Sequence, residues 1–372
     1  MPALALGQAV FGITILVVQA AVFKAWPRAV PAGATPCPGV SILKPLYGEE
    51  PGLYECLRSF CVQDYPLYEV VFGVHDPDDA AIAVVRRLQR EFPGRTLTLV
   101  IDPRRHGANA KVSNLINLST AARHDILVLA DADIRVGRDY LQVVTAELQD
   151  PGVGIVTCLY RARPGAQFWS RLEAIFIHDW FVPQVLLAKT LGSRDFAFGA
   201  TIAVQRATLA AIGGFEGLAS HLADDYELGR RTRALGLRTV LSSYLVETTV
   251  WEPRFRDLVG HQLRWLRTIR TINPAGYAFS WLTFGFPLAV AALLWAPQER
   301  VGILVFLALA ARLVLHFRAC SHLRAKHHFG LVPLADCVLC GLWAVALVGR
   351  RVSWRGAALA VGADGSIKAN RE

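Results

Sequence analysis

Two aspartates one residue apart are the first candidates for chemistry in this sequence. Asp131 and Asp133 follow the apolar run 126–130, so they stand at the end of a predicted strand. Carboxylate oxygens are hard ligands that suit Mg²⁺ or Mn²⁺, and a metal held there can bridge a sugar diphosphate. Because aspartate is also common in turns after strands, a solvated turn explains this pair equally well when it is taken alone.

Two further acidic positions stand at other predicted element ends. Asp76 follows the apolar run 70–75, where its carboxylate can accept the imide N–H of a uracil base or simply close a turn. Asp224 and Asp225 begin a predicted helix, where carboxylates commonly act as caps. Transfer of a glycosyl group to an alcohol needs a base within hydrogen-bond reach of the hydroxyl. Since one cap is enough, we predict Asp225 as that base.

Cationic residues occupy two segments with helical periodicity. Lys111 lies in the small, polar stretch 106–114, which opens a predicted helix and offers backbone N–H groups to a diphosphate. Arg264 stands beside Trp265 in the segment 261–270, where cations recur on successive helical turns. Arginine binds phosphate oxygens through two parallel N–H bonds and offsets charge on a leaving nucleotide. The same segment also has the pattern of a basic amphipathic helix lying on anionic lipid.

The residues from 40 to 250 alternate short apolar runs with helical periods, which predicts an α/β fold with a mostly parallel sheet. Ligands of such sheets bind at the carboxyl ends of the strands, where the acidic positions are found. The predicted strands span residues 40–46, 70–75, 97–101, 126–130, 154–159, 201–204 and 239–243. The predicted helices span residues 53–61, 79–91, 111–122, 139–148 and 224–235.

An almost uncharged stretch at residues 3–23 is long enough to cross a bilayer. Lys24 and Arg28 follow it, and the positive-inside rule then places the next domain in the cytoplasm. A cleaved signal peptide is the alternative, but no basic segment precedes the stretch and no clear cleavage site follows it. We therefore expect a retained transmembrane anchor over residues 1–28 and a cytoplasmic domain over residues 38–273.

Three more apolar segments, at residues 277–295, 301–317 and 331–348, predict transmembrane or interfacial helices over residues 274–350. A polar tail is expected over residues 351–372. The basic clusters on the two sides of the last segment, at 318–328 and 350–355, each favour the cytoplasm, and a single span between them cannot satisfy both. One apolar segment is therefore expected to be re-entrant or interfacial.

The composition favours a membrane surface as a partner. Of the 372 residues, 53% are hydrophobic, and the net charge of +9 favours anionic partners such as phospholipid headgroups or a diphosphate. No nucleic-acid-binding module is visible, so we expect no nucleic-acid partner. The seven cysteines lack the spaced pairs of a zinc site. Cys337 and Cys340 form a CxxC inside an apolar run, and we predict reduced structural thiols.

Taken in order, these motifs resemble the family-2 glycosyltransferases of the ceramide glucosyltransferase type, which have the GT-A nucleotide-sugar-binding fold. That family carries three spaced aspartate motifs followed by a (Q/R)xxRW helix, and residues 40–270 contain all four. The resemblance implies that Asp76 binds uracil and that Asp225 is the catalytic base. It also implies that Asp131 and Asp133 hold the diphosphate and a divalent metal, Mn²⁺ or Mg²⁺.

The resemblance gives roles to further residues. Arg264 and Trp265 are expected to support the nucleotide phosphates and the acceptor. Lys44, Pro45 and Lys111 are expected at the nucleotide sugar. The expected acceptor-binding residues are Gly199, Ala200, Thr201, Asp224 and His261. His261 stands where the family usually has Gln or Arg, which leaves the role of that position open.

The segments 41–46, 76–79, 111–117 and 196–201 are similar to the bacterial hopanoid-biosynthesis glycosyltransferases. This similarity implies an inverting transfer of N-acetylglucosamine from a UDP-sugar to the lipid bacteriohopanetetrol, at the inner membrane of a bacterium. A ceramide glucosyltransferase using UDP-glucose would share every motif. A processive polysaccharide synthase would need more transmembrane spans to form a channel than the sequence of this chain predicts. A non-catalytic membrane scaffold would leave the intact aspartate set unexplained.

Overall fold

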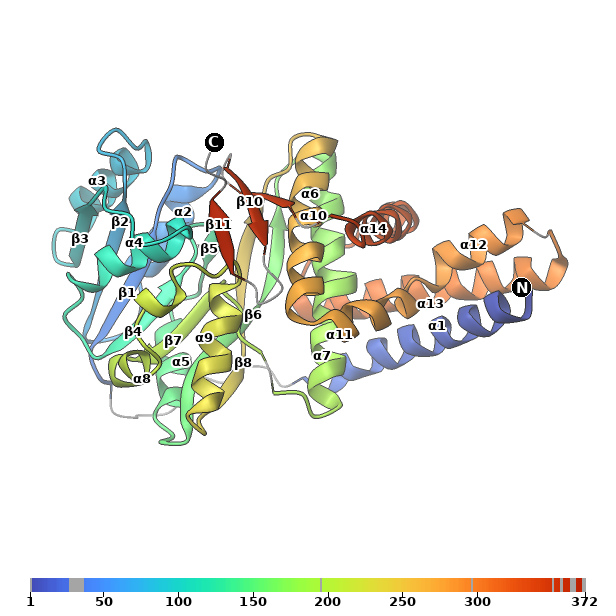
Figure 1. The fold of residues 1–372 in the computed structure, drawn as a ribbon, viewed down its shortest axis with the longest axis horizontal. Helices are drawn as coiled ribbons and strands as arrows, with labels where there is room; N and C mark the ends of the chain where they lie inside the picture. Colours follow the sequence, from blue (N-terminus) through green and yellow to red (C-terminus); the bar gives the residue numbers. More distant parts are fainter. Residues whose placement is uncertain are drawn as a thin grey trace.

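The computed structural model describes residues 2–26, 37–194, 196–295, 297–349, 351–354, 357–361 and 366–369. Figure 1 shows an α/β domain from which a set of long helices projects. Arg28, Arg350 and Arg355 of the predicted membrane flanks lie outside the described residues.

An eight-stranded sheet forms the centre of the α/β domain, in the order β3-β2-β1-β4-β7-β6-β8-β5. Neighbouring strands pair in parallel except where β7 meets β4 and β6 and where β5 meets β8. The predicted α/β fold with a mostly parallel sheet is therefore confirmed. The strands are β1 (Val40–Pro45), β2 (Tyr68–Val74), β3 (Thr96–Ile101), β4 (Ile126–Ala130), β5 (Ile134–Arg135), β6 (Val153–Pro164), β7 (Thr201–Gln205) and β8 (Arg238–Val250).

Helices cover both faces of this sheet because its central strands are apolar on both sides. In β1, where all residues are buried, Ile42 packs into one hydrophobic cluster and Leu43 into another. All predicted helices of this domain are present, and α8 was not predicted. The helices are α2 (Leu53–Cys61), α3 (Ala81–Glu91), α4 (Ala110–Ser119), α5 (Tyr140–Leu148), α8 (Arg206–Ala211) and α9 (Asp224–Ala234).

A second group of helices stands between the α/β domain and the projecting helices (Figure 1). One helical run contains α6 (Phe168–Phe176), a π-helical turn (Ile177–Phe181) and α7 (Val182–Thr190). α10 (Phe255–Ile272) packs against α6 and leads into α11 (Pro274–Phe279). A π-helical turn inside a longer helix is frequently found at a functional site.

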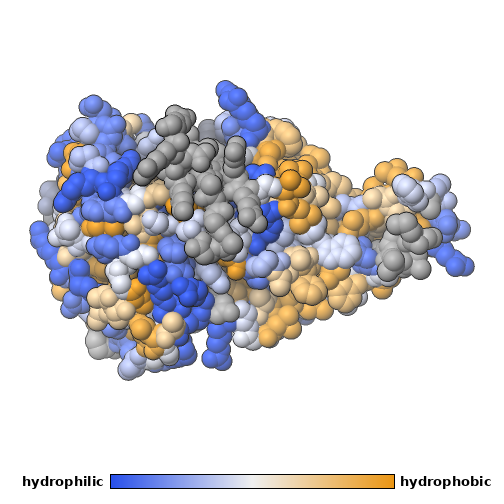
Figure 2. Space-filling view, in the orientation of Figure 1, coloured by the Kyte–Doolittle hydropathy of each residue, from blue (hydrophilic) through white to orange (hydrophobic). Residues whose placement is uncertain are grey.

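The projecting helices α1 (Pro2–Val22), α12 (Gly285–Trp295) and α13 (Glu299–Leu323) pack along one another. Apolar residues gather over them, whereas the α/β domain is more polar (Figure 2). By length and composition, two helices among the described residues can cross a membrane, Glu299–Leu323 and Phe329–Ala346. A third span is added if Pro274–Thr283 and Gly285–Trp295, bent by 60°, are counted together.

The last apolar segment contains α14 (Val332–Ala346), which is seen almost end-on in Figure 1 while α1 and α13 run across the view. Hydrogen bonds fix the chain before α14 and at its end. Arg161 of β6 donates a 2.6 Å hydrogen bond to the Leu323 carbonyl at the end of α13. Arg270 of α10 donates to the carbonyls of Ala346 and Gly349. The segment before α14 therefore contacts β6, and the residues at its end contact α10.

The residues after α14 form strands where the sequence predicted a polar tail. β9 (Arg351–Trp354), β10 (Ala357–Val361) and β11 (Ile367–Ala369) make a three-stranded antiparallel sheet. The physical reason lies in the sequence: Ser353 separates the apolar Val352 and Trp354, and residues 357–361 form a short apolar run, and both patterns are typical of strands. The Ile367 N–H donates a 2.8 Å hydrogen bond to the Ser220 carbonyl, so the chain returns to the α/β domain.

Candidate active site

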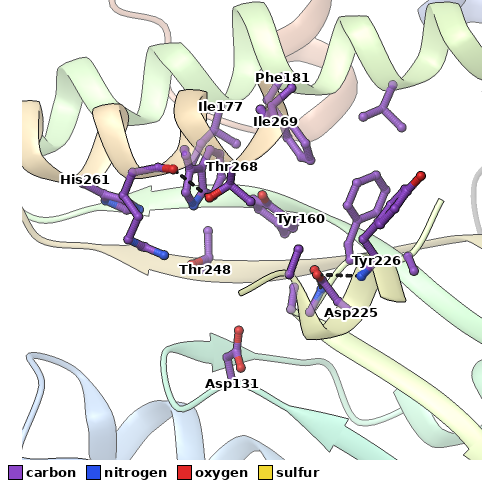
Figure 3. Close-up of a pocket in the computed structure, with 18 of the residues that line it drawn as sticks. Asp131, Tyr160, Ile177, Phe181, Asp225, Tyr226, Thr248, His261, Thr268 and Ile269 are labelled. Carbon is purple, nitrogen blue, oxygen red and sulfur yellow. Dashed lines mark hydrogen bonds between the residues drawn. The ribbon is translucent and has the colours of Figure 1, made fainter. Parts of the chain in front are cut away.

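A cavity of about 990 Å³ opens at the carboxyl edge of the sheet, where strand ends face α7, α10 and α11. The first wall, called here the acidic wall, consists of Asp131, Asp133, Asp224 and Asp225. The opposite wall, called here the aromatic wall, consists of Tyr160, Trp180, Phe181, Phe198 and Trp265. Figure 3 shows Asp131 and Asp225 below the cavity and Phe181 above it.

Asp131 stands directly after β4 and is paired with a lysine. Its carboxylate lies 2.5 Å from Lys111 Nζ, which in turn lies 3.8 Å from Asp224 Oδ2. Asn109 caps α4, the helix that carries Lys111, and also donates a 3.3 Å hydrogen bond to Asp224. Burial disfavours the charge on Lys111, but the carboxylates of Asp131 and Asp224 outweigh it and raise the pKa of Lys111. Lys111 is therefore a fixed positive charge beside the predicted diphosphate site.

Asp133 faces the cavity two residues further along the chain. Thr248 of β8 donates a 2.6 Å hydrogen bond to its carboxylate. Burial, and then the negative charge of Asp131, raise the pKa of Asp133. A divalent cation would relieve this repulsion, and the two carboxylates supply the hard oxygen ligands that Mg²⁺ and Mn²⁺ prefer. The residues present therefore fit the predicted metal.

Asp225 lies in the first turn of α9, and two backbone N–H groups fix its carboxylate. Gly199 donates to Oδ2 at 2.7 Å. Tyr226 donates to Oδ1 at 2.8 Å (Figure 3). A Cβ on Gly199 would lie only 3.1 Å from Oδ2, so a glycine suits this contact. Burial, and then the neighbouring Asp224, raise the pKa of Asp225 to about 6. Such a carboxylate is ionised near pH 7 and still basic enough to accept a proton.

The predicted nucleotide-binding residues of β1 separate in the structure. Pro45 lines the cavity, whereas Lys44 is fully buried beneath the turn of Asp131. Lys44 Nζ donates a hydrogen bond to the Asp131 carbonyl and lies 4.2 Å from the centroid of the Phe60 ring. Burial lowers the pKa of Lys44 to about 8. The structure corrects the predicted role: Lys44 supports the loop of Asp131 from below, because its side chain points into the core.

Asp76 follows β2 at the same edge of the sheet, two strands away from β4. Its side chain is exposed and accepts a 2.9 Å hydrogen bond from the Asp78 N–H. It is not among the residues that line the cavity. Asp76 closes a turn in this structure, and its contact with a uracil base stays a prediction.

The predicted acceptor-binding residues fall into two groups. Gly199, Ala200, Asp224 and His261 line the cavity. Thr201 does not, because it begins β7 and is only 1% exposed. The structure therefore corrects the prediction for Thr201.

α10 presents His261, Arg264 and Trp265 to the cavity. His261 Nδ1 lies 2.9 Å from Glu252 Oε1 and 3.9 Å from Glu173 Oε1. Burial disfavours the charge on His261, but Glu173 and Glu252 outweigh it and raise the pKa of His261. The segment 261–265 thus forms part of the cavity wall, with Glu173 and Glu252 next to His261.

Sequence reasoning missed most of the aromatic wall and also Glu252. Phe181 lies at the centre of that wall, with its ring centroid 5.0 Å from that of Tyr160, 5.4 Å from Phe198 and 5.6 Å from Trp265. These rings come from apolar runs that carry no chemical signal. An acid directly after a long strand, as at 251–253, is the signal that could have identified Glu252.

Curated proteins with similar sequences are glycosyltransferases. Ceramide glucosyltransferase 1 of Caenorhabditis elegans is 27% identical over 208 residues, which cover 56% of this chain and 44% of that protein. An N-acetylglucosaminyltransferase of Rhizobium meliloti is 25% identical over 251 residues, which cover 64% of this chain and 58% of that protein. The chain thus spans about half the length of these two relatives.

A solved structure shares the fold over most of the chain. The mannosyltransferase PcManGT from Pyrobaculum calidifontis, in complex with GDP-Man and Mn²⁺, superposes with a TM-score of 0.58 at 22% identity. The match covers 91% of this chain and 97% of that one, and it agrees with the predicted GT-A-like fold. The model of glycosyl transferase family 21 matches residues 4–367. The expected relationship to the ceramide glucosyltransferases is confirmed, and the chain belongs to glycosyl transferase family 21.

Proposed function

We propose that this glycosyltransferase moves N-acetylglucosamine from a UDP-sugar to a hydroxyl of a membrane lipid, bacteriohopanetetrol. The observation that carries the proposal is a single cavity in which an acidic wall, suited to a diphosphate and a proton, faces an aromatic wall, suited to an apolar acceptor. The sugar and the lipid are taken from the motif resemblance. A relative named N-acetylglucosaminyltransferase supports the sugar.

Asp225 is the proposed base. It accepts the proton of the acceptor hydroxyl while the hydroxyl oxygen attacks the anomeric carbon of the donor sugar. The new C–O bond forms opposite the diphosphate, the bond from the anomeric carbon to the phosphate oxygen breaks, and UDP leaves with the electron pair. The anomeric configuration is inverted. The two backbone N–H groups on Asp225 hold the carboxylate in one orientation for this step.

The donor diphosphate is proposed to bind beside Asp131 and Asp133, which would hold Mn²⁺ or Mg²⁺. The cation supplies charge neutralisation on the diphosphate when it is bound. Lys111 contributes a fixed positive charge next to Asp131. Arg264 lines the same cavity, and a guanidinium can bind two phosphate oxygens through two parallel N–H bonds. These two side chains offset the charge that grows on the leaving UDP.

The acceptor is proposed to lie along the aromatic wall. The cavity lining continues from Phe181 through Ile269 and Ile272 to Tyr277 of α11, at the base of the bent apolar helices. A lipid with its hydroxyl at Asp225 can keep its apolar part on this lining and extend toward a bilayer. This arrangement suits a lipid acceptor better than a free sugar.

We further propose that the α/β domain lies on the cytoplasmic face of a bacterial inner membrane, with α1 as the anchor. α12 and α13 then enter the bilayer beside α1, while α14 lies at its surface. The contacts of Arg161 and Arg270 on the two flanks of α14 support this. Both basic clusters around α14 then face the cytoplasm and its anionic phospholipids, which removes the conflict with the positive-inside rule.

The test uses the full chain, purified in detergent, with Mn²⁺ or Mg²⁺, UDP-N-acetylglucosamine or UDP-glucose, and bacteriohopanetetrol or ceramide. Mass spectrometry identifies the product, and nuclear magnetic resonance reports its anomeric configuration. We expect an N-acetylglucosaminyl hopanoid with one sugar and an inverted centre. A retained configuration would contradict the mechanism, and a lengthening sugar chain would indicate a polysaccharide synthase.

A ceramide glucosyltransferase is the second candidate function. Proteins with that name are similar to this chain in several organisms, and their motifs would place the same residues at the same positions. Formation of glucosylceramide in the same assay would move the proposal to this function and keep the mechanism. UDP binding without any lipid product would favour a non-catalytic role.

A further inference from the structure

Glu252 and His261 form a buried polar pair on the cavity wall that the proposed transfer step does not use. Glu252 lies just beyond the carboxyl end of β8 and is 6% exposed. His261 lies on α10, and its Nδ1 lies 2.9 Å from Glu252 Oε1. Both side chains line the cavity.

Of the two carboxylate oxygens of Glu252, one has a hydrogen-bond partner among the described residues. Its Oε1 faces His261, whereas its Oε2 is buried and has no hydrogen-bond partner among the described residues. A buried carboxylate oxygen without a partner is costly. An oxygen of this kind in a cavity wall indicates a ligand that brings a hydrogen-bond donor.

His261 supplies the complementary group. With Nδ1 directed at Glu252, the other ring nitrogen, Nε2, has no hydrogen bond within the described part of the chain. Both carboxylate oxygens of the nearby Glu173 accept hydrogen bonds from the Gln262 amide, at 2.7 and 2.8 Å. Glu173 is also fully buried, so it is not available to a ligand. Although burial opposes the charge, Glu173 and Glu252 raise the pKa of His261 and so favour the protonated ring, in which Nε2 also donates. The protonated pair offers one acceptor, Glu252 Oε2, and one donor, His261 Nε2–H.

We propose that Glu252 and His261 bind a second hydroxyl of the acceptor headgroup, next to the hydroxyl that attacks the donor. A hydroxyl both donates and accepts a hydrogen bond, so it satisfies Glu252 Oε2 and His261 Nε2 together. The pair sits beside Arg264 and Trp265 on α10, the helix that continues along the aromatic wall to Ile269 and Ile272. This inference rests on the proposed lipid acceptor and makes the enzyme selective for a polyhydroxylated headgroup.

A metal ion does not explain the cluster as well. Glu173, Glu252 and His261 could together surround a cation. However, the nitrogen that faces the carboxylates already lies at hydrogen-bond distance from Glu252, and Glu173 is occupied by the Gln262 amide.

The test compares bacteriohopanetetrol with a hopanoid that carries one terminal hydroxyl, using wild type, Glu252→Gln, His261→Ala and His261→Gln. We expect Glu252→Gln and His261→Ala to raise the KM for the tetrol about 10- to 100-fold, the usual effect of losing a hydrogen bond to a charged group. The KM for the single-hydroxyl lipid should rise much less than the KM for the tetrol. His261→Gln restores a donor and should recover part of the loss. The exposed Glu55, changed to Gln, is the control.

Direct binding separates this inference from the proposed function. Native mass spectrometry of the UDP-bound protein measures the preference for the tetrol over the single-hydroxyl lipid without turnover. If wild type binds both lipids equally, or if the variants keep the wild-type preference, the inference is wrong even when transfer occurs. If the variants change the preference between UDP-N-acetylglucosamine and UDP-glucose, and not between lipids, the pair contacts the donor sugar and the inference is again overturned. Loss of transfer with the lipid preference intact would count against the proposed function alone.

Discussion

The two walls of the cavity are held in place by different forces. The acidic wall is fixed by short polar contacts: the N–H groups of Gly199 and Tyr226 on Asp225, Lys111 on Asp131, and a threonine hydroxyl on Asp133. The aromatic wall is held by ring packing around Phe181, which defines position less strictly than directed hydrogen bonds. The first wall is therefore suited to a reaction and the second to recognition of an apolar surface.

The aromatic wall is also the wall that connects to the apolar helices α13 and α14. Asp179 lies in the π-helical turn that carries Phe181, and its carboxylate lies 2.8 Å from His316 Nδ1 of α13. Its carbonyl accepts a 3.1 Å hydrogen bond from Arg312, which pairs with Asp336 of α14. Substitutions on the acidic wall should therefore change kcat, whereas substitutions on the aromatic wall should change the KM for the proposed lipid acceptor.

The largest expected effect comes from a substitution of Asp225, the proposed general base on the acidic wall. Asp225→Asn keeps the size of the side chain but removes the proton acceptor, so we expect kcat to fall roughly 10²- to 10⁴-fold. Binding of the UDP-sugar, measured by calorimetry, should be nearly unchanged. Asp64→Asn, on an exposed aspartate paired with Arg138, is the matched control. A variant that keeps more than half of the wild-type kcat would show that Asp225 is not the base.

The next effect concerns the metal. Asp133→Asn removes one of the two carboxylates proposed to hold the cation, so we expect kcat/KM for the donor to fall roughly 100-fold. Rates measured over a range of Mn²⁺ concentrations should show weaker apparent metal affinity, and added Mn²⁺ should recover part of the activity. Equal metal dependence in wild type and variant would place the cation elsewhere.

The sequence predicted the acidic wall better than the aromatic wall, and the reason is physical. Asp131 follows a strand whose residues are all buried, and Asp225 begins a helix, so local patterns are enough to place both at the sheet edge. Residues 168–190 are mostly apolar. Their pattern of apolar and polar residues did not predict the helical run with its π-helical turn. The sequence did not reveal that Lys44 is buried under the loop of Asp131. Its hydrogen-bond partner, the Asp131 carbonyl, is 87 residues away in the chain, and local patterns do not show such a distant contact.

A smaller effect tests the aromatic wall. Phe181→Ala removes the ring that joins Tyr160, Phe198 and Trp265, and the loss of about 1.4 kcal/mol of packing would raise the lipid KM about 10-fold. The donor KM should stay constant because Phe181 lies across the cavity from Asp131, one of the residues proposed to hold the donor diphosphate (Figure 3). Phe168→Ala, on a half-exposed ring outside the cavity lining, is the control. A change in donor KM without a change in lipid KM would reverse the roles assigned to the two walls.

The smallest effect is a shift in pH dependence within the acidic wall. Burial and Asp224 raise the pKa of Asp225 to about 6, and a base must be deprotonated to act, so activity should fall as the pH drops through about 6. Asp224→Asn removes the neighbouring negative charge, which lowers the pKa of Asp225 and moves this limb of the kcat profile to lower pH. The variant therefore keeps a larger share of its maximal rate at pH 5.5 than wild type does.

Buffers of constant ionic strength are needed, since exposed charges elsewhere on the chain are screened by salt. A limb that stays in place would mean that Asp224 does not set the basicity of Asp225, and a profile without a limb would remove Asp225 from the proton transfer altogether.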